Sequence, residues 1–307
     1  MAPVLSVTLP NFGDLFPPGE WRRYLDLART AEQAGVDRIV VVDHVVMGRN
    51  TDAYAWGPFP GTSDEPWLEP LTVLSAVAAV TERIRLATGV LIAPLRGAAL
   101  LAKTAATLDQ LSGGRLELGV GTGWQREEYD AAGVEWERRG QILTDTIGAC
   151  KALWRDAPAT FTSETVEFTD IWCEPKPVQP GGVPLWIGGT LHPRNLERLA
   201  RWGDGWIPIM GETPEGLASG VRTARAAWSA AGRDPAGLGV QASLPIRRDT
   251  AGRPDLARSL ESVPELVAAG GTVVNVYLTA FCPDVTEAGA FFHELVRGLA
   301  AVSSPVP

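Results

Sequence analysis

The sequence has few of the residues on which metal sites and disulfide frameworks depend. Its 307 residues include three histidines and three cysteines, Cys150, Cys173 and Cys282. The cysteines are odd in number and unpatterned, which argues against a disulfide framework or a zinc site. No apolar run approaches the roughly 18 residues that span a bilayer. The first residues also lack the basic start and apolar stretch of a signal peptide. We therefore expect a cytoplasmic protein with no metal and no membrane partner.

Positive charge is scarce as well. The net charge is −9, and no stripe of lysine and arginine stands out, so nucleic acid is not an expected partner. Hydrophobic residues make up 45% of the chain and charged residues 21%, a balance typical of globular proteins. We expect the partner to be a small-molecule substrate.

Short runs rich in Val, Ile and Leu alternate with longer amphipathic segments. The runs mostly lack polar alternation, which is typical of strands buried on both faces of a parallel sheet. One amphipathic segment, Trp21–Gly35, places Tyr24, Leu27, Ala28 and Ala31 on one stripe and ends at a glycine. The expected strands are Ser6–Leu9, Arg38–Val42, Ile84–Val90, Leu116–Gly121, Leu185–Gly188, Gly205–Ile209, Gly239–Leu244 and Thr272–Leu278.

Eight β-then-α units predict an α/β protein with a (β/α)8 TIM barrel, and an open doubly wound sheet is the rival. We expect a single domain over residues 1–307. Two segments interrupt the pattern, Val45–Leu68 after the second strand and Ala157–Gly182 before the fifth. The first should lie at the C-terminal mouth of the barrel, where its aromatic residues would cover a bound ring. The second should either wrap around from the opposite end or form a hairpin without a role in the site.

Residues that follow the strands of a barrel converge on one mouth. Here they are rich in glycine and poor in charge, which disfavours a metal hydrolase or a glycosidase, since both need several converging ligands or carboxylates. Gly119, Gly121 and Gly123 are spaced Gly-x-Gly-x-Gly, which is not the Rossmann fingerprint. A glycine-rich rim suits a planar organic cofactor, because backbone can pack against a ring face. The rim residues expected to line such a cofactor include Thr88, Gly89, Val90, Gly121, Thr122 and Gly123.

The turn after the fifth strand has features of a phosphate site. Gly188, Gly189 and Thr190 leave the strand, and Pro193 suits an early helical position. Free N–H groups at that helix start would bind a phosphate, to which Arg194 would add charge. A plain capped turn is the alternative.

Asp43 and His44 follow the second strand. An imidazole at a barrel mouth is able to donate or accept a proton. In the alternative interpretation, Asp43 caps a turn and His44 only forms a hydrogen bond with the loop.

Taken together, these segments resemble the luciferase-like monooxygenase superfamily, and within it the branch of oxidoreductases that depend on the deazaflavin coenzyme F420. The matching pieces occur in family order over about residues 4–210. They are DHVV, TERIRLATGVLIAPLR, AKTAATLDQLSGGRLELGVGTGWQREEY, RRGQILTDTI, PLWIGG and RLARWGDGW.

The resemblance implies F420 or FMN at the barrel mouth and a homodimer. It implies that the Gly89–Val90 peptide is cis and bulges against the central ring, that Asp43 and His44 lie near the ring and the substrate, and that Gly188–Thr190 bind the phosphate. Sugar-phosphate dehydrogenases of this branch carry a glutamate after Gly-Thr-Gly, where this chain has Trp124. We therefore expect a more apolar substrate.

The sequence thus predicts an F420-dependent oxidoreductase that transfers a hydride between deazaflavin and a small organic substrate. His44 and Asp43 would be catalytic, and Trp56, Trp67 and Trp124 would shape the substrate pocket. The first alternative is an FMN-dependent monooxygenase, in which His44 assists oxygen chemistry. The second alternative is a flavin-binding protein without turnover.

Overall fold

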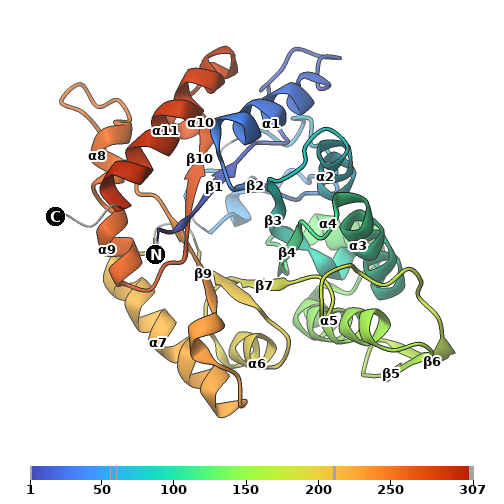
Figure 1. The fold of residues 1–307 in the computed structure, drawn as a ribbon. Helices are drawn as coiled ribbons and strands as arrows, with labels where there is room; N and C mark the ends of the chain where they lie inside the picture. Colours follow the sequence, from blue (N-terminus) through green and yellow to red (C-terminus); the bar gives the residue numbers. More distant parts are fainter. Residues whose placement is uncertain (1, 56, 60, 210–211, 304–307) are drawn as a thin grey trace.

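Eight parallel strands close into a barrel in a computed structural model that describes residues 2–55, 57–59, 61–209 and 212–303. The strands follow one another around the barrel in the order β1, β10, β9, β8, β7, β4, β3 and β2 (Figure 1). The (β/α)8 prediction is confirmed and the open sheet is wrong, because β1 pairs with both β2 and β10 and leaves no edge. The bounds are β1 Val4–Thr8, β2 Arg38–Val41, β3 Arg85–Ile92, β4 Leu116–Gly121, β7 Leu185–Gly188, β8 Gly205–Ile207, β9 Gly239–Ser243 and β10 Val273–Tyr277.

Helices surround this barrel (Figure 1). The first one shows how the sequence sets their bounds. Tyr24, Leu27, Ala28 and Ala31 form its buried stripe, as predicted, and Gly35 ends it in the left-handed conformation at φ 97°. The helices are α1 Arg23–Ala34, α2 Pro70–Ala78, α3 Ala98–Ser112, α4 Arg126–Ala132, α5 Arg139–Arg155, α6 Pro193–Arg201, α7 Pro214–Ala230, α8 Leu256–Leu260, α9 Val263–Ala268, α10 Leu278–Phe281 and α11 Ala288–Ser303.

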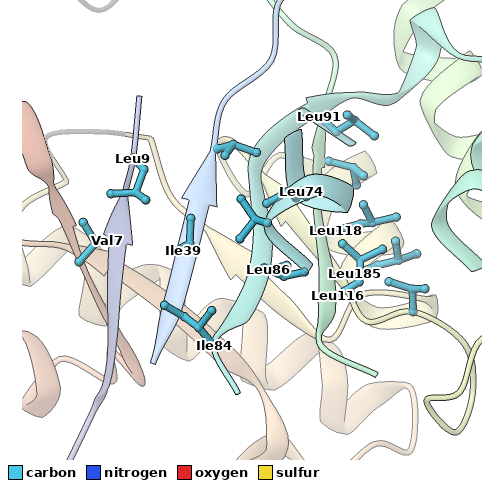
Figure 2. Packing of buried hydrophobic residues seen from close by; sticks show 14 of the residues in the cluster. Val7, Leu9, Ile39, Leu74, Ile84, Leu86, Leu91, Leu116, Leu118 and Leu185 are labelled. Atoms are coloured by element: carbon cyan, nitrogen blue, oxygen red, sulfur yellow. The ribbon is translucent and has the colours of Figure 1, made fainter. Parts of the chain in front are cut away.

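The main hydrophobic core lies between the barrel wall and these helices. Figure 2 shows side chains of this core on and beside the strands, together with Leu74 of α2, and Leu116, Leu118 and Leu185 lie close together in it. Each fully buried leucine of this kind stabilises the fold by roughly 1.5–3 kcal/mol. Alternate residues of the same strands face inward, so the barrel wall separates two different environments.

Polar side chains fill much of the barrel interior. Asn275 of β10 accepts a hydrogen bond from Ser6 Oγ at 2.9 Å and donates one to Thr8 Oγ1 at 2.9 Å. All three side chains are buried. The strands are therefore covered on both faces, as their composition indicated, but the inner face is polar where the outer face is aliphatic.

A buried ion pair lies among the residues that begin the strands, a region we call the floor and define by Arg38, Arg85, Glu117, Trp186 and Gln241. Arg38 Nε lies 3.1 Å from Glu117 Oε2, and Arg85 donates to the other oxygen of the same carboxylate. The Arg38 guanidinium also lies 4.6 Å from the centroid of the Trp186 ring. Burial lowers the pKa of Arg38, and the charge of Glu117 opposes this lowering.

The two insertions have different fates. Residues 157–182 contain an antiparallel hairpin, β5 Ala159–Thr162 and β6 Glu167–Ile171, which lies outside the barrel beside α5 (Figure 1). Asp145 of α5 anchors it by accepting hydrogen bonds from Thr165 N and Oγ1 at 2.9 and 2.7 Å. The hairpin alternative is therefore the one observed.

The segment Val45–Leu68 lies at the C-terminal mouth, as predicted. Leu68 N donates to Asn11 O at 2.8 Å, and Gly48 N donates to Gln125 Oε1 at 2.7 Å, which ties both ends of the segment to residues that follow strands.

The three cysteines are buried and free. Among the described residues, no helix combines the length and the apolar character needed to cross a bilayer.

Candidate functional site

Asp43 follows β2 and is fully engaged in a buried ion pair. Its carboxylate accepts from Arg96 Nη1 at 2.6 Å, from Arg96 Nη2 at 3.0 Å and from Ile92 N at 2.7 Å. Arg96 also donates to Glu69 Oε1 at 2.8 Å. Burial alone would lower the pKa of Arg96, but its bonds to Asp43 and Glu69 outweigh burial and raise it. With its carboxylate engaged by these three donors, Asp43 fixes the β3 exit and is poorly placed to transfer protons.

His44 has a different set of partners. Its Nδ1 lies 2.9 Å from Glu128 Oε2, and its Nε2 accepts a hydrogen bond from Trp124 Nε1 at 3.2 Å. Glu128 is completely buried and also accepts from Val45 N at 2.8 Å through Oε1. Both imidazole nitrogens are therefore bonded, one to an acid and the other to an indole.

An aromatic cluster surrounds the imidazole, and we define it by Phe12, Tyr54, Phe59, Trp67 and Trp124. Trp67 stacks on Phe12 at a centroid distance of 4.1 Å and meets the His44 ring edge to face at 4.6 Å. Trp124 and Tyr54 meet at 5.3 Å. Two of the three predicted pocket tryptophans thus lie beside His44, whereas Trp56 lies outside the described residues.

The rim glycines make room for a valine. The peptide between Gly89 and Val90 is cis, as the resemblance implied, and the pairing of β3 with β4 shifts register there. A Cβ added to Gly188 would lie 2.5 Å from Val90 Cγ1, and one added to Gly121 would lie 2.8 Å from Val90 Cγ2. The space beside these two glycines is thus filled by the bulged valine, which the sequence alone did not indicate.

The turn after β7 has the geometry of an anion site. Gly189 takes φ 106°, which only glycine adopts readily, and α6 begins with Pro193 at its first position. The N–H groups of Arg194 and Asn195 lie in the first turn and therefore have no intrahelical acceptor. Within the part of the chain that the structure describes, no side chain caps this helix. Thr190 and Arg194 are exposed beside them. The predicted phosphate residues are therefore brought together with free donors.

A buried arginine stabilises this turn. Asn195 Nδ2 donates to Thr190 O at 2.8 Å, and Arg198 Nη1 donates to Asn195 Oδ1 at 2.5 Å. Among the described residues no carboxylate lies within ion-pair distance of Arg198, although its side chain is buried. Burial, followed by the charge of Arg194, lowers the pKa of Arg198 to about 10. Burial and then the charges of Arg198 and Arg194 lower the pKa of His192, so two cationic side chains lie close to this turn.

Several of these residues escaped the sequence analysis. Glu128 lies in a helix of mostly charged residues, and Arg96 follows an apolar strand, so neither stood out from its neighbours. Tyr277 ends β10 at the mouth. Burial raises its pKa to about 12, and a hydrogen bond with Ser243 opposes this shift. No signal in the sequence pointed to Glu128, because its contacts with His44 and Val45 join segments far apart in the chain.

Known proteins share this fold and part of this sequence. An uncharacterized protein of Mycobacterium tuberculosis (strain ATCC 25618 / H37Rv) is 37% identical over 213 residues, which cover 67% of this chain and 74% of that protein. An F420-dependent secondary alcohol dehydrogenase, solved with an F420-acetone adduct, has a TM-score of 0.77 at 18% identity, covering 97% of this chain and 99% of that one. A long-chain alkane monooxygenase has a TM-score of 0.75 at 15% identity, covering 98% and 92%.

The two structures are too distant in sequence to show more than a shared fold. The family is shown by the sequence instead. The sequence model of the family described as "Luciferase-like monooxygenase" matches residues 4–259. This match runs from β1 past β9 and includes each residue placed at the mouth above except Tyr277. The chain therefore belongs to the luciferase-like monooxygenase family and is an oxidoreductase of that family.

Proposed function

We propose that the protein is an F420-dependent oxidoreductase that moves a hydride between deazaflavin and a small, rather apolar organic substrate. One observation carries the proposal, which is the combination of three features at the barrel mouth. They are the uncapped start of α6 with its arginines, the bulge at Val90 backed by glycines, and the hydrogen-bonded His44 imidazole covered by aromatic rings. Bound deazaflavin would supply a two-electron hydride acceptor or donor. The chain has to hold it, exclude water and handle the accompanying proton.

The cofactor side of the site is the wall and the turn. Val90, packed on Gly121 and Gly188, presents an apolar surface suited to a planar ring. The N–H groups of α6 with Thr190 and Arg194 would bind the phosphate, and Arg198 would contribute positive charge from below. Thr122 and Gly123 would complete the cofactor wall. Thr88 is fully buried, with its hydroxyl donating to Gly119 O at 2.8 Å, and would support that wall from behind. Asp43 would act indirectly, by fixing Arg96 and the backbone at Ile92.

The substrate side is the aromatic cluster. Phe59, Trp67 and Trp124 offer ring faces and edges around His44, which favours an apolar molecule over a sugar phosphate. His44 would exchange the proton that accompanies hydride transfer. Trp56 stays a predicted pocket residue.

An FMN-dependent monooxygenase is the alternative within the same family. The barrel is shared with an enzyme named for F420 and with a monooxygenase, so the fold leaves the cofactor open. We would purify the protein from a host that makes F420 and record the absorption spectrum of what remains bound. Titration with reduced F420 and reduced FMN would follow. Tight FMN binding with oxygen consumption and no response to F420 would overturn the proposal.

Replacing His44 tests its role and the rival reading of a flavin-binding protein without turnover. His44→Ala should lower the turnover number about 100-fold or more, the usual contribution of a general acid or base. Cofactor affinity should stay unchanged. His293→Ala is the matched control, since His293 is exposed on α11. An unchanged rate in His44→Ala would remove the imidazole from the mechanism.

The homodimer, the cytoplasmic location and the organisation of residues 1–307 as one domain stay predictions. Sedimentation of the purified protein at several concentrations would test the dimer directly.

A further inference from the structure

Three groups in a row determine where the proton of His44 resides. An indole nitrogen carries a hydrogen and has no lone pair to offer, so Trp124 Nε1 is always a donor. His44 Nε2, 3.2 Å away, must therefore be the acceptor and carries no proton. A neutral imidazole has one N–H, which then lies on Nδ1 and points at Glu128 Oε2, 2.9 Å away.

Glu128 suits this role because its own position is fixed. Its carboxylate is completely buried, and Oε1 is held by the backbone N–H of Val45, the residue next to His44 in sequence. The second oxygen is thereby aimed at the imidazole. Buried histidines in catalytic sites are commonly oriented in this way, with a third group setting the tautomer.

We propose that Glu128 and Trp124 together hold His44 as a proton acceptor, with the proton on Nδ1 and the lone pair of Nε2 reserved by the indole until a substrate donor replaces it. The proposal rests on the proposed function for the identity of the reaction. Glu128 is a positioning residue in this scheme, and Trp124 competes with the substrate for one atom.

The arrangement also selects the substrate class. A molecule that displaces the indole N–H must itself donate a hydrogen bond to Nε2, which an alcohol does and a ketone or alkane does not. The hydroxyl O–H bond would break as an N–H bond forms on Nε2, and the C–H bond of the same carbon would break as its hydride leaves for the cofactor, so that a C=O bond forms. The resulting imidazolium would face the Glu128 carboxylate. The deazaflavin of the proposed function supplies the two-electron acceptor for this oxidation.

The position of the proton is measurable without cofactor or substrate. Nitrogen-15 NMR of histidine-labelled protein, at a pH where the imidazoles are neutral, distinguishes a protonated Nδ1 from a protonated Nε2. The chain has three histidines, so His44→Ala assigns the signal. We expect His44 to carry its proton on Nδ1, and a proton on Nε2 would overturn the proposal.

Glu128→Gln gives the sharper test. The glutamine oxygen has to stay on Val45 N–H, since a backbone donor cannot turn away, so its NH2 group faces Nδ1. The proton of His44 should then move to Nε2. Combining this change with Trp124→Phe should complete the shift, because the opposing indole N–H is gone. A proton that stays on Nδ1 in the double variant would show that Glu128 does not set the tautomer.

Asp130→Asn is the matched control for the charge change. Asp130 lies on the same helix with 62% of its side chain exposed, 3.7 Å from Arg126, and its replacement should leave the His44 spectrum unchanged. If Glu128→Gln does not fold, the wild-type and Trp124→Phe spectra still decide, since both should show the proton on Nδ1.

Kinetics with an alcohol substrate separate the two roles. Glu128→Gln should lower the turnover number about 100-fold with little change in KM. Trp124→Phe should lower KM about fivefold, the worth of one competing hydrogen bond. A protein that binds FMN and ignores F420 would end the proposed function, yet leave the NMR result standing. The wrong tautomer would end this inference alone.

Discussion

The floor of the barrel and its mouth both bury charge, but they satisfy it differently. In the floor, none of the side-chain nitrogens of Arg38 makes a hydrogen bond within the described residues, and neither does Glu117 Oε2. Charge attraction and the Trp186 ring hold the guanidinium there. At the mouth, Asp43 and Glu128 are bonded through both oxygens to donors with defined directions.

The difference separates stability from precision. An ion pair with incomplete hydrogen bonding tolerates small displacements, so it can join strands without fixing any atom closely. A carboxylate with several aimed donors fixes both its own position and that of its partners, which catalysis requires. This contrast agrees with the general division of barrels, in which the N-terminal end supports the fold and the C-terminal end carries the chemistry.

The largest effect is expected in the floor. Glu117→Gln leaves the buried Arg38 guanidinium without its counter-charge, which costs about 3–5 kcal/mol when one partner of a buried pair is removed. The free energy of unfolding from urea titration should fall by that amount, while the activity of the folded fraction stays unchanged.

Glu137→Gln is the control, because Glu137 pairs with Arg126 at 2.8 Å on the surface with 61% of its side chain exposed. Its replacement should leave the free energy of unfolding nearly unchanged, because solvent screens an exposed pair. Equal effects of the two variants would show that the floor pair is no stronger than a surface pair.

A smaller effect is expected from the wall of the mouth. In Gly188→Ala the new Cβ would approach Val90 Cγ1 to 2.5 Å, so the bulge has to shift, at a cost of about 1–3 kcal/mol. Val90→Ala should relieve that cost, so the double variant should be more stable than the sum of the single changes predicts. Additive effects in thermal unfolding would mean that Val90 is not the neighbour that requires this glycine.

The smallest effect concerns Glu32, which joins α1 to the start of β3 at the N-terminal end. Burial pushes up the pKa of Glu32, but hydrogen bonds from the N–H groups of Ile84, Arg83 and Glu82 outweigh burial and lower it from 4.5. A lowered folded pKa means that the charged form stabilises the fold above about pH 4.5 and that this stability is lost as the pH falls further.

Glu32→Gln should therefore cost about 1 kcal/mol or less at pH 7 and almost nothing in strong acid. Urea titrations of both proteins across this range would measure it. A difference that persists unchanged into strong acid would assign the effect to packing and not to charge.

The barrel was predictable because its signals are local. The stripe of Tyr24, Leu27, Ala28 and Ala31 and the glycine after it specify a helix from neighbouring residues alone, and each βα unit repeats that logic. Boundaries were less certain: β3 extends to Ile92, two residues beyond the expected Val90, and β8 ends at Ile207, two residues before the expected Ile209. The polar inner face was not predicted from the sequence, because Ser6, Thr8 and Asn275 form hydrogen bonds with one another only after the barrel closes.

The site was predictable only in part, for the same reason. His44 and the Gly188–Thr190 turn stand at strand ends, and that position is readable from the chain. Glu128 becomes a partner of His44 at a sequence separation of 84 residues, a contact that no local pattern encodes.

By itself the sequence determined eight βα units, a mouth poor in charge and a histidine at its edge, since periodicity and strand-end position depend on near neighbours. Only the tertiary structure decided that Asp43 belongs to Arg96, that the rim glycines accommodate Val90 and that an acid and an indole hold the two nitrogens of His44. Hydrogen bonds and contacts of that kind depend on distances of a few ångströms between segments far apart in the chain, and closure of the barrel sets those distances.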